Sequence, residues 1–183
     1  EGDLEDVEIE CYFNMFPSVI RTDDKNTNIN NIRKHQYDKM IEYISNNYDN
    51  FNKLIIMGHH PLCFCKTKIV KGNIEIRKGY SKLINDLIKL EKIIKLSDKQ
   101  ITYICADVHF FEYSTIKIGD IIINQYIVGT GGTDLDNPLS ESFYDGIVLK
   151  VDDEASEEKI ISDYTYTVYD QKKEFGYLVY DNN

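Results

Sequence analysis

The stretch LIIMGHHPL at residues 54–62 takes an apolar run directly into a glycine, two histidines and a proline. The chain has only four histidines, and two of them lie here. The apolar run predicts a short core strand, and Gly58 and Pro61 mark the point where it ends. In an open α/β sheet, ligands bind beyond the carboxyl ends of the strands. We therefore expect His59 and His60 to lie at a sheet edge where chemistry takes place.

A second unit of the same kind follows along the chain. Helical spacing of apolar residues predicts helices over 32–48 and 80–96. Each helix is followed by a short apolar run that predicts a strand, over 53–57 and over 101–106. The second strand leads into Asp107 and His109, so both strands deliver histidine at their carboxyl ends. Imidazole and carboxylate together suit divalent metals such as Zn, Mn or Fe. The sequence therefore predicts a metal site in a cleft between the two strand ends.

The other elements follow from periodicity and turn residues. Alternating apolar residues over 7–15 predict a half-buried strand, and the polar stretch 17–31 predicts a surface loop. Hairpins are predicted over 68–77, with a turn at Gly72-Asn73, and over 114–128, with a turn at Gly119-Asp120. A glycine-rich turn at 129–132 precedes two or three further strands between 146 and 180. No composition shift divides the chain, so we expect residues 1–183 to form a single domain segment.

Composition and charge exclude several classes of function. The net charge of −10 repels phosphate backbones, so we expect no sequence-independent nucleic-acid binding. The chain has no apolar run near the roughly 20 residues that a membrane span needs. The four cysteines lack the usual metal or redox spacing, so we expect reduced thiols in an intracellular, cytoplasmic protein.

Each motif also has a simpler interpretation. His59-His60-Pro61 could be a turn with solvated imidazoles, Asp107 a turn or cap residue, and His109 a satisfied core histidine. The glycine run could be only a tight turn. The order of the motifs along the chain favours a functional site over these separate interpretations.

That order resembles the C-terminal half of the calcineurin-like metallophosphoesterase superfamily, in particular its purple-acid-phosphatase-like branch. Gly58-His59-His60-Pro61 resembles the family's Gly-His-x-Pro motif, and residues 106–109 (Ala-Asp-Val-His) resemble its Gly-His-x-His motif with two substitutions. The resemblance covers roughly residues 35–148. It implies an α/β fold, the C-terminal half of a four-layer α/β/β/α sandwich with a mixed sheet and helices outside.

The resemblance also implies roles for individual residues. His59 would bind the second of two metal ions and His109 the first, while Asp107 stands where the family has another histidine on the second metal. His60 would be the catalytic residue on the substrate side. The implied cofactors are two divalent or mixed-valence ions of Fe, Zn or Mn, and the implied reaction is phosphate ester hydrolysis. Alone, the chain should bind metal weakly, because half a ligand set leaves most positions to water.

Other ligand motifs of the family do not occur in this sequence. No Asp-x-His precedes His59, no Gly-Asn-His occurs, and Gly2-Asp3-Leu4-Glu5-Asp6 is interpreted as a chance match to Gly-Asp-x-x-Asp. We therefore expect the N-terminal half of the domain to lie in the same longer chain or in a separate chain. The alternative is a catalytically inactive relative that serves as a structural or protein-interaction module.

Cationic residues gather directly after the histidine pair, within an acidic chain. The segment 66–78 has five Lys or Arg residues and one acid. Lys68, Lys71 and Arg77 are predicted to attract the phosphate of the substrate. The simpler interpretation is an exposed edge hairpin whose lysines discourage strand-to-strand aggregation.

Overall fold

The computed structural model describes residues 6–71, 73–80, 83–130, 134–138, 149–150 and 164–174. Contacts divide the chain into two compact units, residues 1–50 and 51–183, which are described separately here. The expectation that residues 1–183 form a single domain segment stays a prediction. Residues 131–132 of the glycine run, and most of the region between 146 and 180, lie outside the described residues.

The first unit begins with helix α1, Asp6–Met15, where the sequence predicted a strand. That prediction is wrong because only Ile9 and Phe13 of the alternating apolar set are buried, and they lie four positions apart on one helix face. They form a small core with Ile29 and Ile32 of the second helix. Contacts with a partner helix therefore decide the structure of this segment.

Helix α2 spans Lys25–Asn46 and is followed by the short helix η1, Tyr48–Asn50. The prediction of a loop over 17–31 is wrong for its second half, because α2 begins at Lys25. Asp24 caps this helix, and its carboxylate accepts a hydrogen bond of 2.7 Å from the Thr27 amide. No helix among the described residues is long and apolar enough to cross a membrane.

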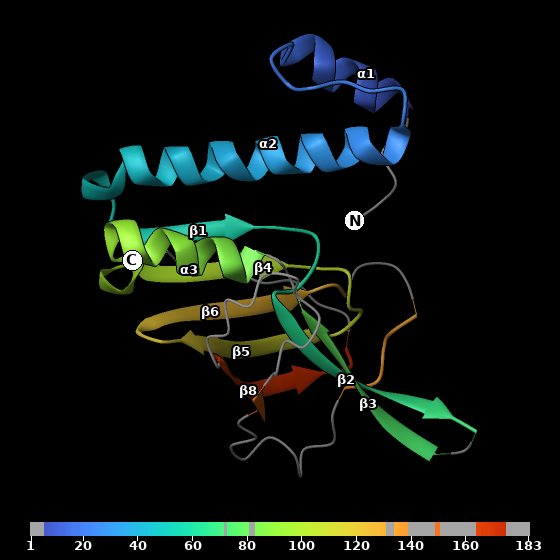
Figure 1. The fold of residues 1–183 in the computed structure, drawn as a ribbon. Coiled ribbons are helices and arrows are strands. Elements are labelled where there is room, and N and C mark those ends of the chain that lie inside the picture. The colour runs from blue at the N-terminus through green and yellow to red at the C-terminus, as the bar shows by residue number, and fades with distance from the viewer. Residues whose placement is uncertain are drawn as a thin grey trace. The chain divides into compact units, whose positions relative to one another are not determined.

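The second unit contains a six-stranded mixed sheet with the strand order β1-β4-β6-β5-β8-β7. Figure 1 labels β1, β4, β6, β5 and β8 in that order. The strands are β1 Lys53–Met57, β4 Gln100–Cys105, β5 Phe111–Ile118, β6 Ile121–Val128, β7 Leu149–Lys150 and β8 Tyr164–Lys172. β1, β4 and β6 are parallel to one another, and the other neighbours pair antiparallel. The α/β class with a mixed sheet is confirmed.

β1 has the predicted bounds but not the predicted burial. It lies at one end of the strand order, and only Ile56 is buried. Ile55 and Met57 are exposed, with Met57 at 77%. The expectation of a core strand is therefore wrong for this edge strand.

Between β1 and β4 the chain forms a separate hairpin and a helix. β2, Cys63–Val70, pairs with β3, Asn73–Tyr80, in a two-stranded sheet that extends away from the main sheet in Figure 1. Val70 pairs with Asn73, so the turn begins at Lys71, with φ of 49°, one residue earlier than predicted. Helix α3, Leu83–Ile94, and the short helix η2, Leu96–Asp98, complete the crossover.

Candidate metal site

The loops that follow β1 and β4 are bonded directly to each other. The Gly58 amide donates to the carbonyl oxygen of Ile104 at 3.0 Å, and the Ala106 amide donates to the carbonyl oxygen of His59 at 2.9 Å. Backbone pairing therefore continues beyond the ends of the two parallel strands. This pairing places the histidine loop beside the loop that contains Asp107.

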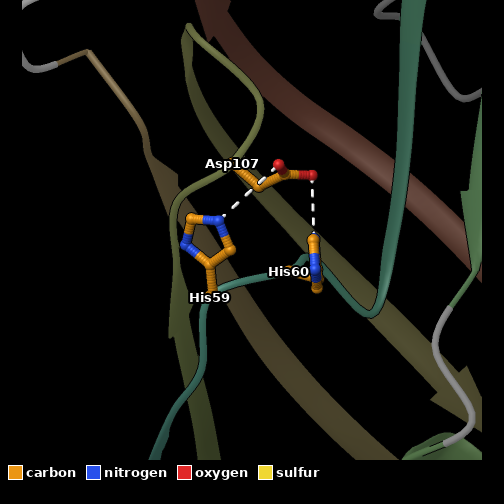
Figure 2. Close-up of side chains that lie close together, drawn as sticks. All are labelled: His59, His60 and Asp107. Carbon is orange, nitrogen blue, oxygen red and sulfur yellow. Dashed lines mark ion pairs between the residues drawn. The ribbon is translucent and has the colours of Figure 1, made fainter. Parts of the chain in front are cut away.

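His59, His60 and Asp107 form one cluster at this edge (Figure 2). His60 Nδ1 lies 3.0 Å from Asp107 Oδ2, and His59 Nε2 lies 3.8 Å from Asp107 Oδ1. The imidazole centroids are 4.8 Å apart, and the planes of the rings are inclined at 63°. One potential ligand atom from each residue lies within 4.8 Å of the others. The structure therefore brings together three of the four residues predicted as metal ligands or as catalytic.

The cluster is open to solvent. The side chains are 62% exposed for His59, 36% for His60 and 40% for Asp107. Ion pairs at such exposure add little to stability because water screens them. The backbone that positions the three residues thus explains the arrangement better than their mutual attraction does. Because the three side chains are exposed, an ion from solution can reach all of them.

Asp107 lies in a strained turn. Its φ is 61°, and the Val108 amide donates to the carbonyl oxygen of Ala106 at 2.7 Å. A turn closed over one residue with positive φ is rare, although aspartate tolerates this region better than most residues. Strained backbone of this kind occurs preferentially at functional sites.

Gly129 permits this turn by its lack of a side chain. A Cβ atom at Gly129 would lie 2.1 Å from the carbonyl oxygen of Val108, which is a backbone atom and cannot rotate away. The first glycine of the predicted glycine run therefore lies directly against the Asp107 turn, although the two are separated along the chain.

Gly58 has a corresponding role in the histidine loop. A Cβ atom there would lie 2.1 Å from the hydroxyl oxygen of Tyr103, and that hydroxyl donates to the carbonyl oxygen of His60 at 2.8 Å. The sequence analysis missed Tyr103. The available signal was a tyrosine in a mostly apolar strand, since a buried phenolic hydroxyl usually has a hydrogen-bond partner.

A buried polar network supports the chain just after the histidine pair. The side-chain oxygen of Gln125 accepts bonds from the amides of Leu62 and Cys63 at 2.8 and 3.3 Å, and its nitrogen donates to the Cys63 carbonyl at 2.6 Å. That nitrogen also lies 3.4 Å from the carboxylate of Glu112, a fully buried residue. Sequence reasoning missed both side chains, which lie on the core face of the sheet.

Glu112 is the centre of this network. Its carboxylate accepts hydrogen bonds from Tyr166, Ser114 and Gln171 at 2.5, 2.7 and 2.5 Å. Burial raises the pKa of Glu112 to about 7, and the hydrogen bonds oppose that rise. Burial also raises the pKa of Cys105, one of four free thiols, so this cysteine is a poor metal ligand.

His109, the fourth predicted site residue, does not join the cluster within the described part of the chain. Its Nδ1 lies 3.2 Å from the carbonyl oxygen of Asp134, and its backbone amide donates to the carboxylate of Asp136 at 3.0 Å. His60, predicted as catalytic, contacts Asp107 instead. The ligand role of His109 and the catalytic role of His60 remain predictions.

The cations predicted to bind substrate lie on the hairpin. Lys68 and Lys71 are exposed, and Arg77 pairs in register with Lys66. Lys66 itself contacts both carboxylate oxygens of Asp136 at 2.9 Å.

The cluster suits one divalent ion better than two. Zinc binds histidine nitrogen and carboxylate oxygen at about 2.0–2.2 Å, so the ligands of one ion lie at most about 4 Å apart. The span of 4.8 Å requires only a small rotation of the exposed side chains. A second ion would need ligands that this cluster does not supply.

No protein-family model, curated protein or solved structure matches the chain, so the resemblance to metallophosphoesterases rests on the sequence motifs.

Proposed function

We propose that the chain binds a divalent metal ion through His59, His60 and Asp107 and supplies this half-site to a metal-dependent phosphoesterase. The observation that carries the proposal is the convergence of three potential ligands from the ends of two parallel strands. The strained Asp107 turn and the exposure of the side chains support it. The reaction class comes from the motif order of the sequence.

The metal would supply positive charge that polarises a phosphoryl oxygen. His59, His60 and Asp107 would hold the ion, and His60 would also lie on the substrate side of the site. Lys68, Lys71 and Arg77 would raise the local concentration of phosphate ester by long-range attraction within an acidic protein.

A dinuclear centre of Fe, Zn or Mn requires more ligands than this cluster. We propose that these come from the N-terminal half of a four-layer α/β/β/α sandwich, in the same longer chain or a separate one. In the completed site, His109 would be available to the other ion if its ring turned away from Asp134.

A specific observation also favours the rival function, an inactive structural or interaction module. His60 and Asp107 are 3.0 Å apart, and the ring of His109 contacts Asp134, so these polar groups have partners without an ion. In such a module the cluster would be a structural remnant.

Activity of the completed domain separates the two functions. The chain is combined with the segment that carries the missing ligands and assayed against an aryl phosphate with Mn²⁺ or Zn²⁺. The phosphoesterase proposal predicts hydrolysis that is lost in H59A but retained in H35A, which removes an imidazole from the first unit. An assembled domain that binds metal and stays inactive across metals and pH would favour the inactive module.

A further inference from the structure

We propose that Asp136 is a positioning residue, which holds the Asp107 loop in the conformation that presents the Asp107 carboxylate to the metal. The inference rests on the metal site of the proposed function. It assigns a structural task to a residue outside the ligand cluster.

The loop that needs holding consists of two very tight turns. The Val108 amide donates to Ala106, and the Phe110 amide donates to Val108, at 2.7 and 3.0 Å. Each bond spans only two residues, and Asp107 has a φ of 61°. The turn centred on Asp107 has the positive φ of the rare, strained form, and strained backbone persists only when surrounding contacts determine it. The Asp107 loop therefore depends on contacts from other segments.

Asp136 provides a reciprocal pair of such contacts. The His109 amide donates to the Asp136 carboxylate at 3.0 Å, and the Asp136 amide donates to the His109 carbonyl at 2.9 Å. His109 lies two residues after Asp107, so the pair fixes the end of the strained segment. A hydrogen bond to a carboxylate is stronger than one between neutral groups.

Asp136 is itself fixed to the strand that follows the histidine loop. Both of its carboxylate oxygens contact Lys66 Nζ at 2.9 Å, with the two side chains only 21% and 28% exposed. The neighbouring Thr67 amide donates to the Asn137 carbonyl at 2.9 Å. One carboxylate thus links β2, which begins three residues after His60, to the loop of Asp107.

The ionised state of Asp136 agrees with this arrangement. Burial by itself disfavours the charge, but the amide of His109 and the ammonium of Lys66 together hold the pKa of Asp136 below its usual value. The carboxylate is therefore charged at neutral pH and can make both contacts.

The test compares metal binding in the parent chain and in D136N. Removing an interaction that orients a metal ligand typically weakens binding 10- to 100-fold, and we expect about tenfold for Zn²⁺ here. We also expect a changed visible absorption spectrum of the Co²⁺ form, because the geometry of the Asp107 ligand changes. D38N makes the same charge change in the exposed Lys34–Asp38 pair of α2. It should leave the Zn²⁺ affinity and the Co²⁺ spectrum unchanged.

A folded D136N with the affinity and Co²⁺ spectrum of the parent would overturn the inference while leaving the proposed function intact. If the parent chain binds no metal, the proposed function fails and the inference fails with it. If D136N does not fold, K66Q takes its place, since it keeps the bond to His109 but removes the cation that orients Asp136. K66Q should then weaken Zn²⁺ binding several-fold, and unchanged binding would overturn the inference.

Discussion

The hydroxyl of Tyr103 donates a hydrogen bond of 2.8 Å to the carbonyl oxygen of His60. Tyr103 belongs to β4, whereas His60 lies in the loop after β1. A buried side chain of one strand therefore fixes the loop of the neighbouring strand. The position of the histidine pair depends on the sheet as well as on its own loop sequence.

Replacing Tyr103 with phenylalanine should lower the free energy of unfolding by about 1 kcal/mol, the usual net value of one hydrogen bond. Metal binding should weaken as well, because the His60 carbonyl loses its anchor. Denaturant unfolding and Zn²⁺ titration measure the two effects. Y43F removes a hydroxyl from a tyrosine of α2 that is 70% exposed, and it should change neither quantity.

G58A should destabilise the protein by about 1–3 kcal/mol, because its methyl group would overlap the Tyr103 hydroxyl. Removing that hydroxyl relieves the worst overlap. The double variant G58A/Y103F should therefore be more stable than the sum of the two single changes indicates, which a double-mutant cycle measures. Simple additivity would show that Gly58 and Tyr103 are not in contact.

G129A should be harder to rescue than G58A. The added methyl group would lie 2.1 Å from the carbonyl oxygen of Val108, and backbone must move to accommodate it. Because Val108 follows Asp107, the displacement should reach the proposed metal ligand. We expect lower stability and weaker Zn²⁺ binding together. Parent-like Zn²⁺ affinity in folded G129A would contradict the close approach to the Asp107 turn.

The raised pKa of Glu112 predicts that the free energy of unfolding depends on pH. Its pKa is raised from 4.5 in the unfolded chain to about 7 in the folded protein, so the folded state binds the proton more tightly. This contribution is fully present below pH 4.5 and is lost as the pH rises toward 7, a total of about 3 kcal/mol.

E112Q removes this titration and keeps a similar shape. Between pH 4.5 and 7.5, the parent should lose about 3 kcal/mol of unfolding free energy relative to E112Q, as measured by denaturant unfolding at each pH. A difference between the two proteins that stays constant over this range would show that Glu112 titrates normally.

The strands around the site were predictable because they are short apolar or alternating segments that end in glycine or polar residues. β1 and the β5–β6 hairpin match the sequence pattern closely. α1 was not predictable, because five alternating apolar residues favour a strand when the local pattern is considered alone. Burial of Ile9 and Phe13 against α2 favours the helix instead.

The candidate residues His59, His60 and Asp107 were predictable from their places at strand ends, but the contacts that support them were not. Tyr103 and His60 are 43 residues apart in sequence, and Asp136 and His109 are 27 apart. Local sequence patterns do not encode such contacts. The grouping of His60 rather than His109 with Asp107 likewise follows from the positive φ of Asp107 and the contacts of His109 with residues 134–136.

The most direct test of the metal site is calorimetric titration of the chain with Zn²⁺ and Mn²⁺. We predict one weakly bound ion per chain, lost in each of H59A, H60A and D107N, and retained in H109A and H35A. Zn²⁺ or Mn²⁺ binding that survives in both H59A and D107N would contradict the ligand set His59, His60 and Asp107. So would binding that is abolished in H109A but retained in H60A.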